Sequence, residues 1–377
     1  MKPTQRLHGL DGLRAFAMLM GIVVHASLPY WSSLGKISFF WPSDKDQSIS
    51  LWMVFSIIHS WRMPLFFLLA GFFAHLYLSH HGIRPFLFNR LHRVVGPLLI
   101  FGAITAVILP PIWYFGFNGV FKLSGFLGFP DSPGFLGHLW FLYYLSIFYG
   151  VVIIGMALLW VSRVKLYVFR PLLRIFYSPV PLAFIVLVMG SIIVISLNGQ
   201  GESKSVWPLN VPDLIYHGIF FMFGFGLCYR SQLLTTLQTT WVFTVLLLLA
   251  TFSSLVQIAS IMGTGDAKSP EEARLLGLVI VVSTSCASVL FCLGLIGLFQ
   301  RILQRYVKRI RLLSDSSYWI YIMHLPVVAL TTFFLFRYDL QPEIKFLISC
   351  LVTLVIGLIT YRYLIRYSPV GWLLNGR

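Results

Sequence analysis

The segment LDGLRAFAMLMGIVVH, residues 10–25, carries charged and titratable side chains inside an otherwise apolar run. Arg14 and His25 are eleven residues apart, about 20° more than three helical turns, so a helix places both on one face. Asp11, three residues before Arg14, is close enough on that face to pair with it. A guanidinium binds phosphate and an imidazole can act as a general base. The segment therefore predicts an anion-binding group and, about 16 Å further along the helix, a proton acceptor.

Other apolar runs also contain side chains that could do chemistry. Arg62 lies about 16 Å into its run, His324 follows Asp315 by nine residues, and His138 opens the run GHLWFLYYL with Trp140 two residues later. Ionisable groups inside a membrane are costly and usually face the bundle interior or a wet cavity. If these runs adjoin, the side chains line a polar passage. The competing interpretation, a hydrogen bond from each histidine to a neighbouring helix, fits His25 least well because of its spacing from an arginine.

A pair of arginines, Arg90 and Arg93 in FNRLHRVVGP, precedes the third apolar run. Their simplest interpretation is that they fix the orientation of the chain in a membrane. Because arginine binds phosphate with two parallel hydrogen bonds, the pair could also bind a phosphate-bearing molecule.

The elements that must position these residues are membrane-spanning helices. The 377-residue chain is 58% hydrophobic and 11% charged, whereas soluble domains are about 25% charged. About 20 apolar residues cross a bilayer, which predicts an all-α, polytopic transmembrane bundle that forms a single domain, 1–377. About ten spans are expected, at residues 11–31, 51–79, 94–115, 138–160, 179–198, 213–229, 241–262, 273–299, 315–336 and 344–365. Pro64 and Arg62 interrupt the second span, which predicts a kink or break.

Charge and cysteine usage narrow the function classes. The net charge of +16 is spread over alternate loops, as topology requires, and does not indicate a nucleic-acid-binding protein. The excess of Lys and Arg in those loops predicts that both termini are cytoplasmic. The four cysteines form no CxxC pair, so no metal site or disulfide framework is expected. The chain is predicted to be a multi-pass protein of a bacterial inner membrane.

Four separated motifs resemble the integral-membrane acyltransferase family 3. The Arg-x10-His pattern is matched by Arg14 and His25, and LFFLLAGFF matches a second motif with Ala70 where serine is usual. The RxxR pair and YWIYIMHLPVV match two more. The motifs follow in the family's order, and the resemblance extends from about residue 7 to 365.

The resemblance implies transfer of an acyl group from cytoplasmic acyl-CoA to a hydroxyl of an extracytoplasmic glycan such as a periplasmic glucan. Succinyl-CoA or acetyl-CoA would be the co-substrate, with no metal. His25 would act as general base on the hydroxyl, and Arg62 would stabilise oxyanion charge or hold a dicarboxylic acyl group. His324 is expected as a second catalytic or acceptor-binding group.

The same resemblance implies a receptor for the phosphates of coenzyme A, formed by Arg14 and the RxxR pair, with Asp11 orienting Arg14. His138 and Trp140 are expected on the acceptor side. The expected partners are therefore the acyl-CoA donor, an extracytoplasmic carbohydrate and membrane lipid, without nucleic acid. The acyl group, the acceptor and the oligomeric state stay open.

Two other functions compete with the enzyme. A transporter or carrier of an anionic or acyl metabolite would need no chemistry, but inverted-repeat transporters have broken helices at matching positions in both halves. The sequence has Pro64 in one span and no equivalent later interruption, which favours the enzyme. A structural membrane subunit would leave the aligned Asp11, Arg14 and His25 unexplained.

Overall fold

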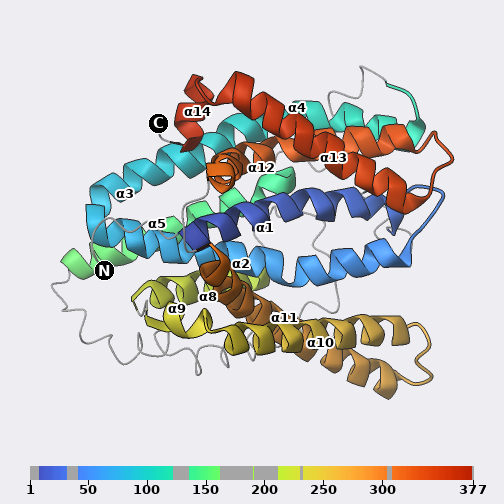
Figure 1. Ribbon diagram of the computed structural model, residues 1–377, viewed down its shortest axis with the longest axis horizontal. Coiled ribbons are helices and arrows are strands. Elements are labelled where there is room, and N and C mark those ends of the chain that lie inside the picture. The colour runs from blue at the N-terminus through green and yellow to red at the C-terminus, as the bar shows by residue number, and fades with distance from the viewer. Residues whose placement is uncertain are drawn as a thin grey trace. The chain divides into compact units, whose positions relative to one another are not determined.

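The computed structural model describes residues 8–31, 41–121, 136–161, 190, 211–229, 232–303 and 308–375. Within these ranges every regular element is helical, as the all-α prediction requires (Figure 1). The α-helices are α1 (His8–Ser27), α2 (Ile49–His81), α3 (Ile83–Arg90), α4 (Gly96–Asn118), α5 (Trp140–Val161), α8 (Val211–Tyr229), α9 (Gln232–Leu237), α10 (Thr240–Gly263), α11 (Pro270–Ile302), α12 (Lys308–Leu335), α13 (Pro342–Thr360) and α14 (Pro369–Asn375). Short 3-10 turns occur at η1 (Leu28–Tyr30) and η4 (Gly137–Leu139), and π-helical turns at η2 (Leu91–Val95) and η6 (Tyr361–Ile365).

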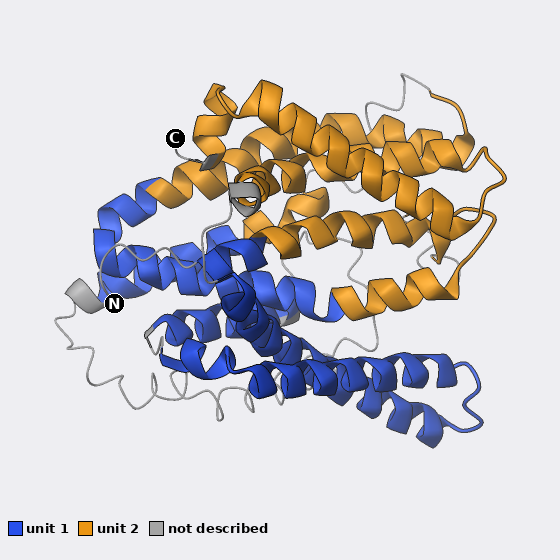
Figure 2. Cartoon of the chain, in the orientation of Figure 1, with its two compact units in different colours: residues 1–14, 59–88, 144–307 blue, residues 15–58, 89–143, 308–377 orange. Residues whose placement is uncertain are grey.

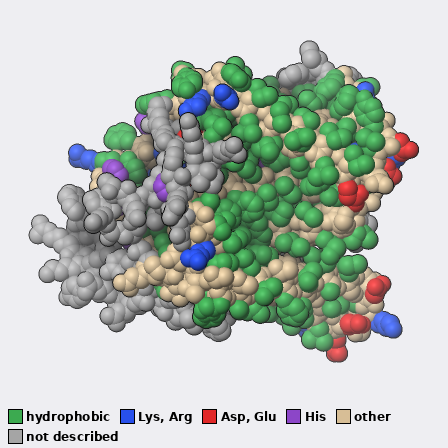
Figure 3. Space-filling model, in the orientation of Figure 1, with side chains coloured by type: hydrophobic (Ala, Val, Ile, Leu, Met, Phe, Trp, Pro, Cys, Tyr) green, Lys and Arg blue, Asp and Glu red, His purple; other side chains and the backbone are tan. Residues whose placement is uncertain are grey.

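Eight helical segments of the described residues are long and apolar enough to cross a membrane. They fall on eight of the predicted spans. The predicted span 213–229 coincides with α8, whose apolar part, Asp213–Cys228, is shorter. The predicted span 179–198 lies outside the described residues except for Gly190. Hydrophobic side chains are widespread on the face drawn in Figure 3, and most of the acidic side chains seen there lie toward its right side.

The described chain divides into two compact units whose segments alternate along the sequence (Figure 2). Unit 1 comprises residues 1–14, 59–88 and 144–307, and unit 2 comprises residues 15–58, 89–143 and 308–377. Helices α1, α2, α3 and α5 therefore contribute residues to both units.

In unit 1, α2 continues through Pro64 as one helix, so the break predicted there is not present. A proline inside a helix has no N–H for the carbonyl four residues earlier, which here belongs to Ser60. The hydroxyl of Ser288, on α11, donates a hydrogen bond to that carbonyl. A neighbouring helix thus satisfies the backbone group that the proline leaves free, as membrane helices require.

Also in unit 1, α2 and α8 approach each other closely where both carry glycine. A Cβ atom added to Gly71 would lie 1.9 Å from the carbonyl oxygen of Phe221. A Cβ atom added to Gly224 would lie 1.7 Å from the carbonyl oxygen of Leu68. Small residues of this kind let helix backbones touch in membranes, where packing drives association.

In unit 2, an aromatic and aliphatic core joins α1, α4, α12 and the segment before α2. Its buried members include Ile22 and Ala26 of α1, Trp113 of α4, Phe333 of α12 and Trp41. The ring of Trp41 lies edge-on to Trp113, with centroids 4.8 Å apart, and edge-on to Phe333 at 6.4 Å. This core fixes how α1 and α12 face each other.

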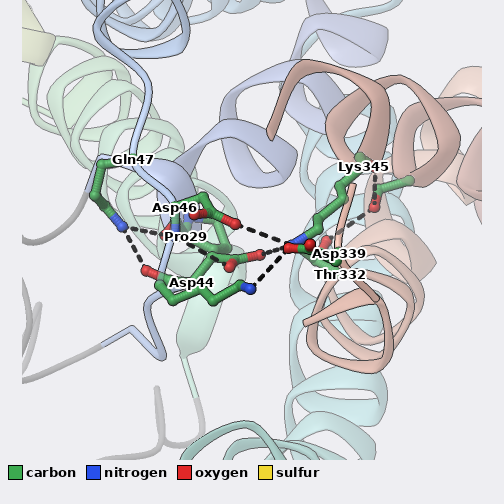
Figure 4. A network of polar contacts seen from close by, with 9 residues as sticks. Pro29, Asp44, Asp46, Gln47, Thr332, Asp339 and Lys345 are labelled. Carbon is green, nitrogen blue, oxygen red and sulfur yellow. Dashed lines mark hydrogen bonds and ion pairs between the residues drawn. The ribbon is translucent and has the colours of Figure 1, made fainter. Parts of the chain in front are cut away.

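A polar network attaches the segment before α2 to α13 (Figure 4). The ammonium of Lys345 lies 2.7 Å from the carboxylate of Asp44, and both side chains are buried, with exposed fractions of 0% and 1%. Asp46 lies 4.0 Å from the same ammonium. Gln47 donates to the carbonyls of Pro29 and Asp44, which closes the segment on itself. Lys345 can be buried because Asp44 supplies the opposite charge.

At the surface of the same network, Lys45 pairs with Asp339 at 2.8 Å. The hydrogen bond and charge of Lys45 hold the pKa of the Asp339 carboxyl below its usual range. Asp339 in turn raises the pKa of Lys45. Both side chains are largely exposed, so solvent screening keeps this pair weak.

Candidate active site

Three imidazoles from three different elements meet in unit 2. His25 comes from α1, His138 from η4 and His324 from α12. The ring centroids of His25 and His324 are 5.1 Å apart, and those of His138 and His324 are 5.0 Å apart. His324 is 1% exposed and His138 6%, while His25 is half-buried. The predicted spans that carry these histidines therefore adjoin.

His324 is oriented by its own helix. Its Nδ1 lies 2.6 Å from the carbonyl oxygen of Tyr321. A carbonyl can only accept a hydrogen bond, so Nδ1 carries the proton. In the neutral ring, Nε2 is then the nitrogen with the lone pair, as in histidines that act as bases after a partner fixes the tautomer. This hydrogen bond lies within α12 and does not reach a neighbouring helix, and it is compatible with a chemically active ring.

His138 is buried and contacts α12. The ring nitrogen Nε2 lies 2.9 Å from the carbonyl oxygen of Ile322, to which it donates. In the opposite direction, the hydroxyl of Tyr321 donates to the carbonyl oxygen of His138 at 2.8 Å. Gly137, with a φ of 40°, takes the left-handed conformation that suits glycine and leads the chain into η4. Two reciprocal hydrogen bonds thus join η4 to α12, and Trp140 follows, half-buried, as the first residue of α5.

Trp41 covers the side of the His25 ring. The two rings are stacked with centroids 5.8 Å apart and planes inclined by 15°. The tryptophan is 7% exposed and belongs to the core of unit 2. Sequence reasoning missed it, because an aromatic residue in a predicted outer loop is typical of any membrane interface. The only signal was that this loop is rich in aromatic residues.

Asp11 and Arg14 lie near the start of α1 and belong to unit 1. A guanidinium nitrogen of Arg14 lies 3.9 Å from a carboxylate oxygen of Asp11, as their spacing predicted. The guanidinium also lies over the ring of Phe73, 5.7 Å from its centroid. The Arg14 side chain is 39% exposed. It is thus oriented by two neighbours while part of its surface stays accessible to a ligand.

Arg62 also belongs to unit 1, one turn before the middle of α2 and two residues before Pro64. It is half-buried, and one guanidinium nitrogen lies 3.6 Å from the sulfur of Met63. A sulfur atom is only a weak acceptor. The contact of Arg62 with Met63 is therefore a weak one.

Arg90 and Arg93 lie at the join between α3 and α4 in unit 2. Arg90 ends α3, and Arg93 belongs to the π-helical turn η2. The Nε and Nη2 groups of Arg93 donate to the carbonyl oxygen of Leu374 in α14, at 3.2 and 3.1 Å. The backbone carbonyl of Arg93 accepts from the hydroxyl of Tyr318 at 2.6 Å. Arg93 therefore has a structural contact that the sequence did not predict, and it uses part of its five N–H donors.

Among the described residues, no group of three or more His, Cys, Asp or Glu side chains could hold a metal ion. The imidazoles that meet in unit 2 are groups that can transfer protons. Two rings in contact, one with its tautomer fixed by a carbonyl, can accept a proton from a hydroxyl and return it to a leaving group.

Comparison with known proteins gives four findings. Residues 7–362 match the sequence model of a family described as an acyltransferase domain. The chain is 25% identical to glucans biosynthesis protein C of Escherichia coli O17:K52:H18 (strain UMN026 / ExPEC), over 100% of this chain and 96% of that protein. The protein of the same name from Escherichia coli K12 is 36% identical over 110 residues, which are 29% of this chain and 26% of the relative. No solved structure matches the chain.

Proposed function

Because the chain belongs to the acyltransferase family that matches residues 7–362, we propose that it moves an acyl group from acyl-CoA to a glycan hydroxyl. The family predicted from the sequence motifs is thereby confirmed. The cytoplasmic donor, the extracytoplasmic acceptor and the location in a bacterial inner membrane are parts of this proposal.

The observation that carries the proposal is the contact between His25 and His324, whose ring centroids are 5.1 Å apart. In the proposed reaction, the His25 imidazole takes the proton of the acceptor hydroxyl. The hydroxyl oxygen then forms a bond to the thioester carbonyl carbon, and the bond from that carbon to sulfur breaks. Coenzyme A leaves as a thiolate and takes the proton back from the imidazolium. His324 is proposed to hold the reacting ring and to share the proton.

Acyl-CoA is proposed as the acyl donor because its negative charge matches the arginines of the chain. Coenzyme A carries several phosphate groups, which guanidinium groups bind well. Arg14, Arg90 and Arg93 are the proposed phosphate ligands. Support comes from Arg14, whose orientation by Asp11 leaves it partly exposed. Arg93 is the weakest of the three, because two of its donors already bind the Leu374 carbonyl.

The acceptor and the acyl group are proposed from the relatives, which are named for the biosynthesis of glucans. A periplasmic glucan is therefore the proposed acceptor, with succinyl or acetyl as the acyl group. A succinyl group carries a carboxylate, and Arg62 is proposed to bind it.

The test is a transfer assay with purified protein in detergent, in which succinyl-CoA or acetyl-CoA is mixed with a glucan and free coenzyme A is measured. His25→Ala should lower turnover by at least about 100-fold, since general base catalysis contributes about 10²–10⁴-fold. His81→Ala, at the exposed end of α2, is the matched control and should keep full activity. Full activity of His25→Ala would contradict the proposed base.

The same assay tests the acyl group. Arg62→Ala should lower turnover with succinyl-CoA more than with acetyl-CoA, because only the succinyl group has a carboxylate for the guanidinium. Arg62→Lys keeps the charge, so its turnover with succinyl-CoA should lie between that of the parent protein and that of Arg62→Ala. A preference for succinyl-CoA that survives Arg62→Ala would exclude this role.

A carrier without chemistry would bind acyl-CoA and release no coenzyme A with any acceptor. Interrupted helices do not decide between the two functions, since prolines lie inside α4 and α12 as well as α2. Release of coenzyme A that depends on the acceptor is the result that separates the enzyme from the carrier.

A further inference from the structure

We propose that His138 is a positioning residue, which holds α12 around Pro326 so that His324 keeps its ring oriented toward His25. This inference rests on the proposed function only for its activity readout. It gives His138 a role other than the contact with the acceptor that the sequence suggested.

The argument begins with Pro326, which lies inside α12. A proline has no N–H, so the carbonyl of Ile322, four residues earlier, lacks its usual helical partner. The Nε2 of His138 lies 2.9 Å from that carbonyl in a buried position. The histidine therefore supplies, from another element, the hydrogen bond that the proline removes.

The second step is that His138 is itself held in place. Its backbone carbonyl accepts from the hydroxyl of Tyr321 at 2.8 Å. Tyr321 and Ile322 are adjacent, so both hydrogen bonds of His138 are made to the same turn of α12. The carbonyl of Tyr321 is also the acceptor for Nδ1 of His324, at 2.6 Å. His138 therefore holds the same turn whose Tyr321 carbonyl fixes the tautomer of His324.

The third step is direct contact between the rings. The His138 and His324 rings meet edge to face, with centroids 5.0 Å apart and planes inclined by 86°. Donation from Nε2 of His138 to a carbonyl leaves Nδ1 as the lone-pair nitrogen of its neutral ring. His138 thus limits where the His324 ring can turn, in addition to holding its backbone.

In unit 1, another proline inside a helix is compensated in the same way, but by a hydroxyl and not by an imidazole. Pro64 in α2 removes the helical hydrogen bond to the Ser60 carbonyl, and the Ser288 hydroxyl donates a hydrogen bond to that carbonyl instead. A hydroxyl is thus sufficient to satisfy such a carbonyl. A histidine at position 138 adds a rigid ring against His324, which a serine could not provide.

The experiment compares His138→Phe, His138→Gln and Pro326→Ala, alone and with His138→Phe and Pro326→Ala combined, in the full-length protein. His138→Phe keeps a ring but removes the donor, and should lower kcat about 10- to 100-fold through misplacement of His324, with little change in KM for the glucan. His138→Gln keeps an N–H donor and should lose less. In the double variant, the amide N–H of residue 326 can bind the Ile322 carbonyl, so part of the lost kcat should return.

A histidine that contacts the acceptor would behave differently. In that case His138→Phe would raise KM for the glucan, and Pro326→Ala would restore nothing. Either result would overturn the positioning role. Size-exclusion profiles and thermal unfolding of each variant show whether a low kcat comes from misfolding.

A second readout does not depend on catalysis. In protein labelled with ¹⁵N-histidine, the ring nitrogen signals of His324 are identified by their loss in His324→Gln. They should show one tautomer, protonated at Nδ1, in the parent protein, a mixture in His138→Phe, and recovery in the double variant. Unchanged signals in His138→Phe would refute the inference. The expected signals in a protein without transferase activity would refute the proposed function alone.

Discussion

Lys345 is a charged residue with no exposed side-chain surface, and its ammonium is held by the buried carboxylate of Asp44. Lys345→Met leaves that carboxylate buried without its cation, which costs about 3–5 kcal/mol of stability. We expect a clear fall in the unfolding temperature in detergent. The same substitution at Lys45, whose partner Asp339 is exposed, should cost less than about 1 kcal/mol.

The pair of variants also tests whether the charge or the shape matters. Asp44→Leu combined with Lys345→Met replaces both charges by apolar groups and should regain much of the lost stability, since such replacements are often neutral. If Lys345→Met were no more harmful than Lys45→Met, the buried pair would not hold the segment that carries Trp41.

At the scale of residues, the sequence could predict that His25 and His324 are candidate site residues, but it could not predict which residues surround them. Each is a titratable residue well inside an apolar run, and that is visible from type and position alone. The partners of Lys345 and His138 are not visible, because Asp44 and Ile322 lie 301 and 184 residues away in the chain. Local spacing carries no information about such contacts, which depend on how the helices pack.

At the scale of elements, the contact between α2 and α8 depends on glycine. A methyl group at Gly71 would meet the carbonyl oxygen of Phe221 at 1.9 Å. Gly71→Ala must therefore push the two helices apart, and we expect a cost of about 1–3 kcal/mol, as for overpacked cores. Thermal unfolding in detergent measures the loss.

Gly150→Ala in α5 is the matched control, since an added Cβ there meets nothing within 4 Å. Alanine favours a helix over glycine by about 1 kcal/mol, so this variant should be as stable as the parent or slightly more. Equal unfolding temperatures for Gly71→Ala and Gly150→Ala would show that α2 and α8 do not touch as described.

The helices themselves were largely predictable, because a run of about 20 apolar residues has few alternatives in a chain of this composition. Their continuity was not. Pro64 predicted a kink or break in α2, and the helix continues through it. The sequence could not show that Ser288, 228 residues after Ser60, donates to the Ser60 carbonyl. The π-helical turns η2 and η6 were likewise absent from the prediction, since their sequences resemble those of the adjoining α-helices.

At the scale of the whole molecule, composition predicted a helical membrane protein, but not its division into two units. Each unit is assembled from three separate stretches of the sequence. No shift in composition marks their boundaries, four of which fall inside helices, namely α1, α2, α3 and α5. Which helices pack together is decided by side-chain contacts, and a hydropathy pattern does not contain them.

The orientation of the chain is the last prediction, because the direction of acyl transfer depends on it. The distribution of Lys and Arg predicts that the end of α2 lies in the cytoplasm and the turn between α10 and α11 outside. Single cysteines at the exposed positions Ser79 and Lys268 would report each side. They require a background in which the native cysteines are replaced, namely Cys228, Cys286, Cys292 and Cys350.

A maleimide that cannot cross the inner membrane should label Lys268→Cys in cells with a permeable outer membrane. It should label Ser79→Cys only after the inner membrane is disrupted. Both positions belong to unit 1, so the result does not depend on how the two units are arranged. The reverse pattern would place Arg14, whose guanidinium lies over Phe73 in the second half of α2, outside the cytoplasm. Acyl-CoA is cytoplasmic in the proposed reaction, so that pattern would leave the donor without its receptor.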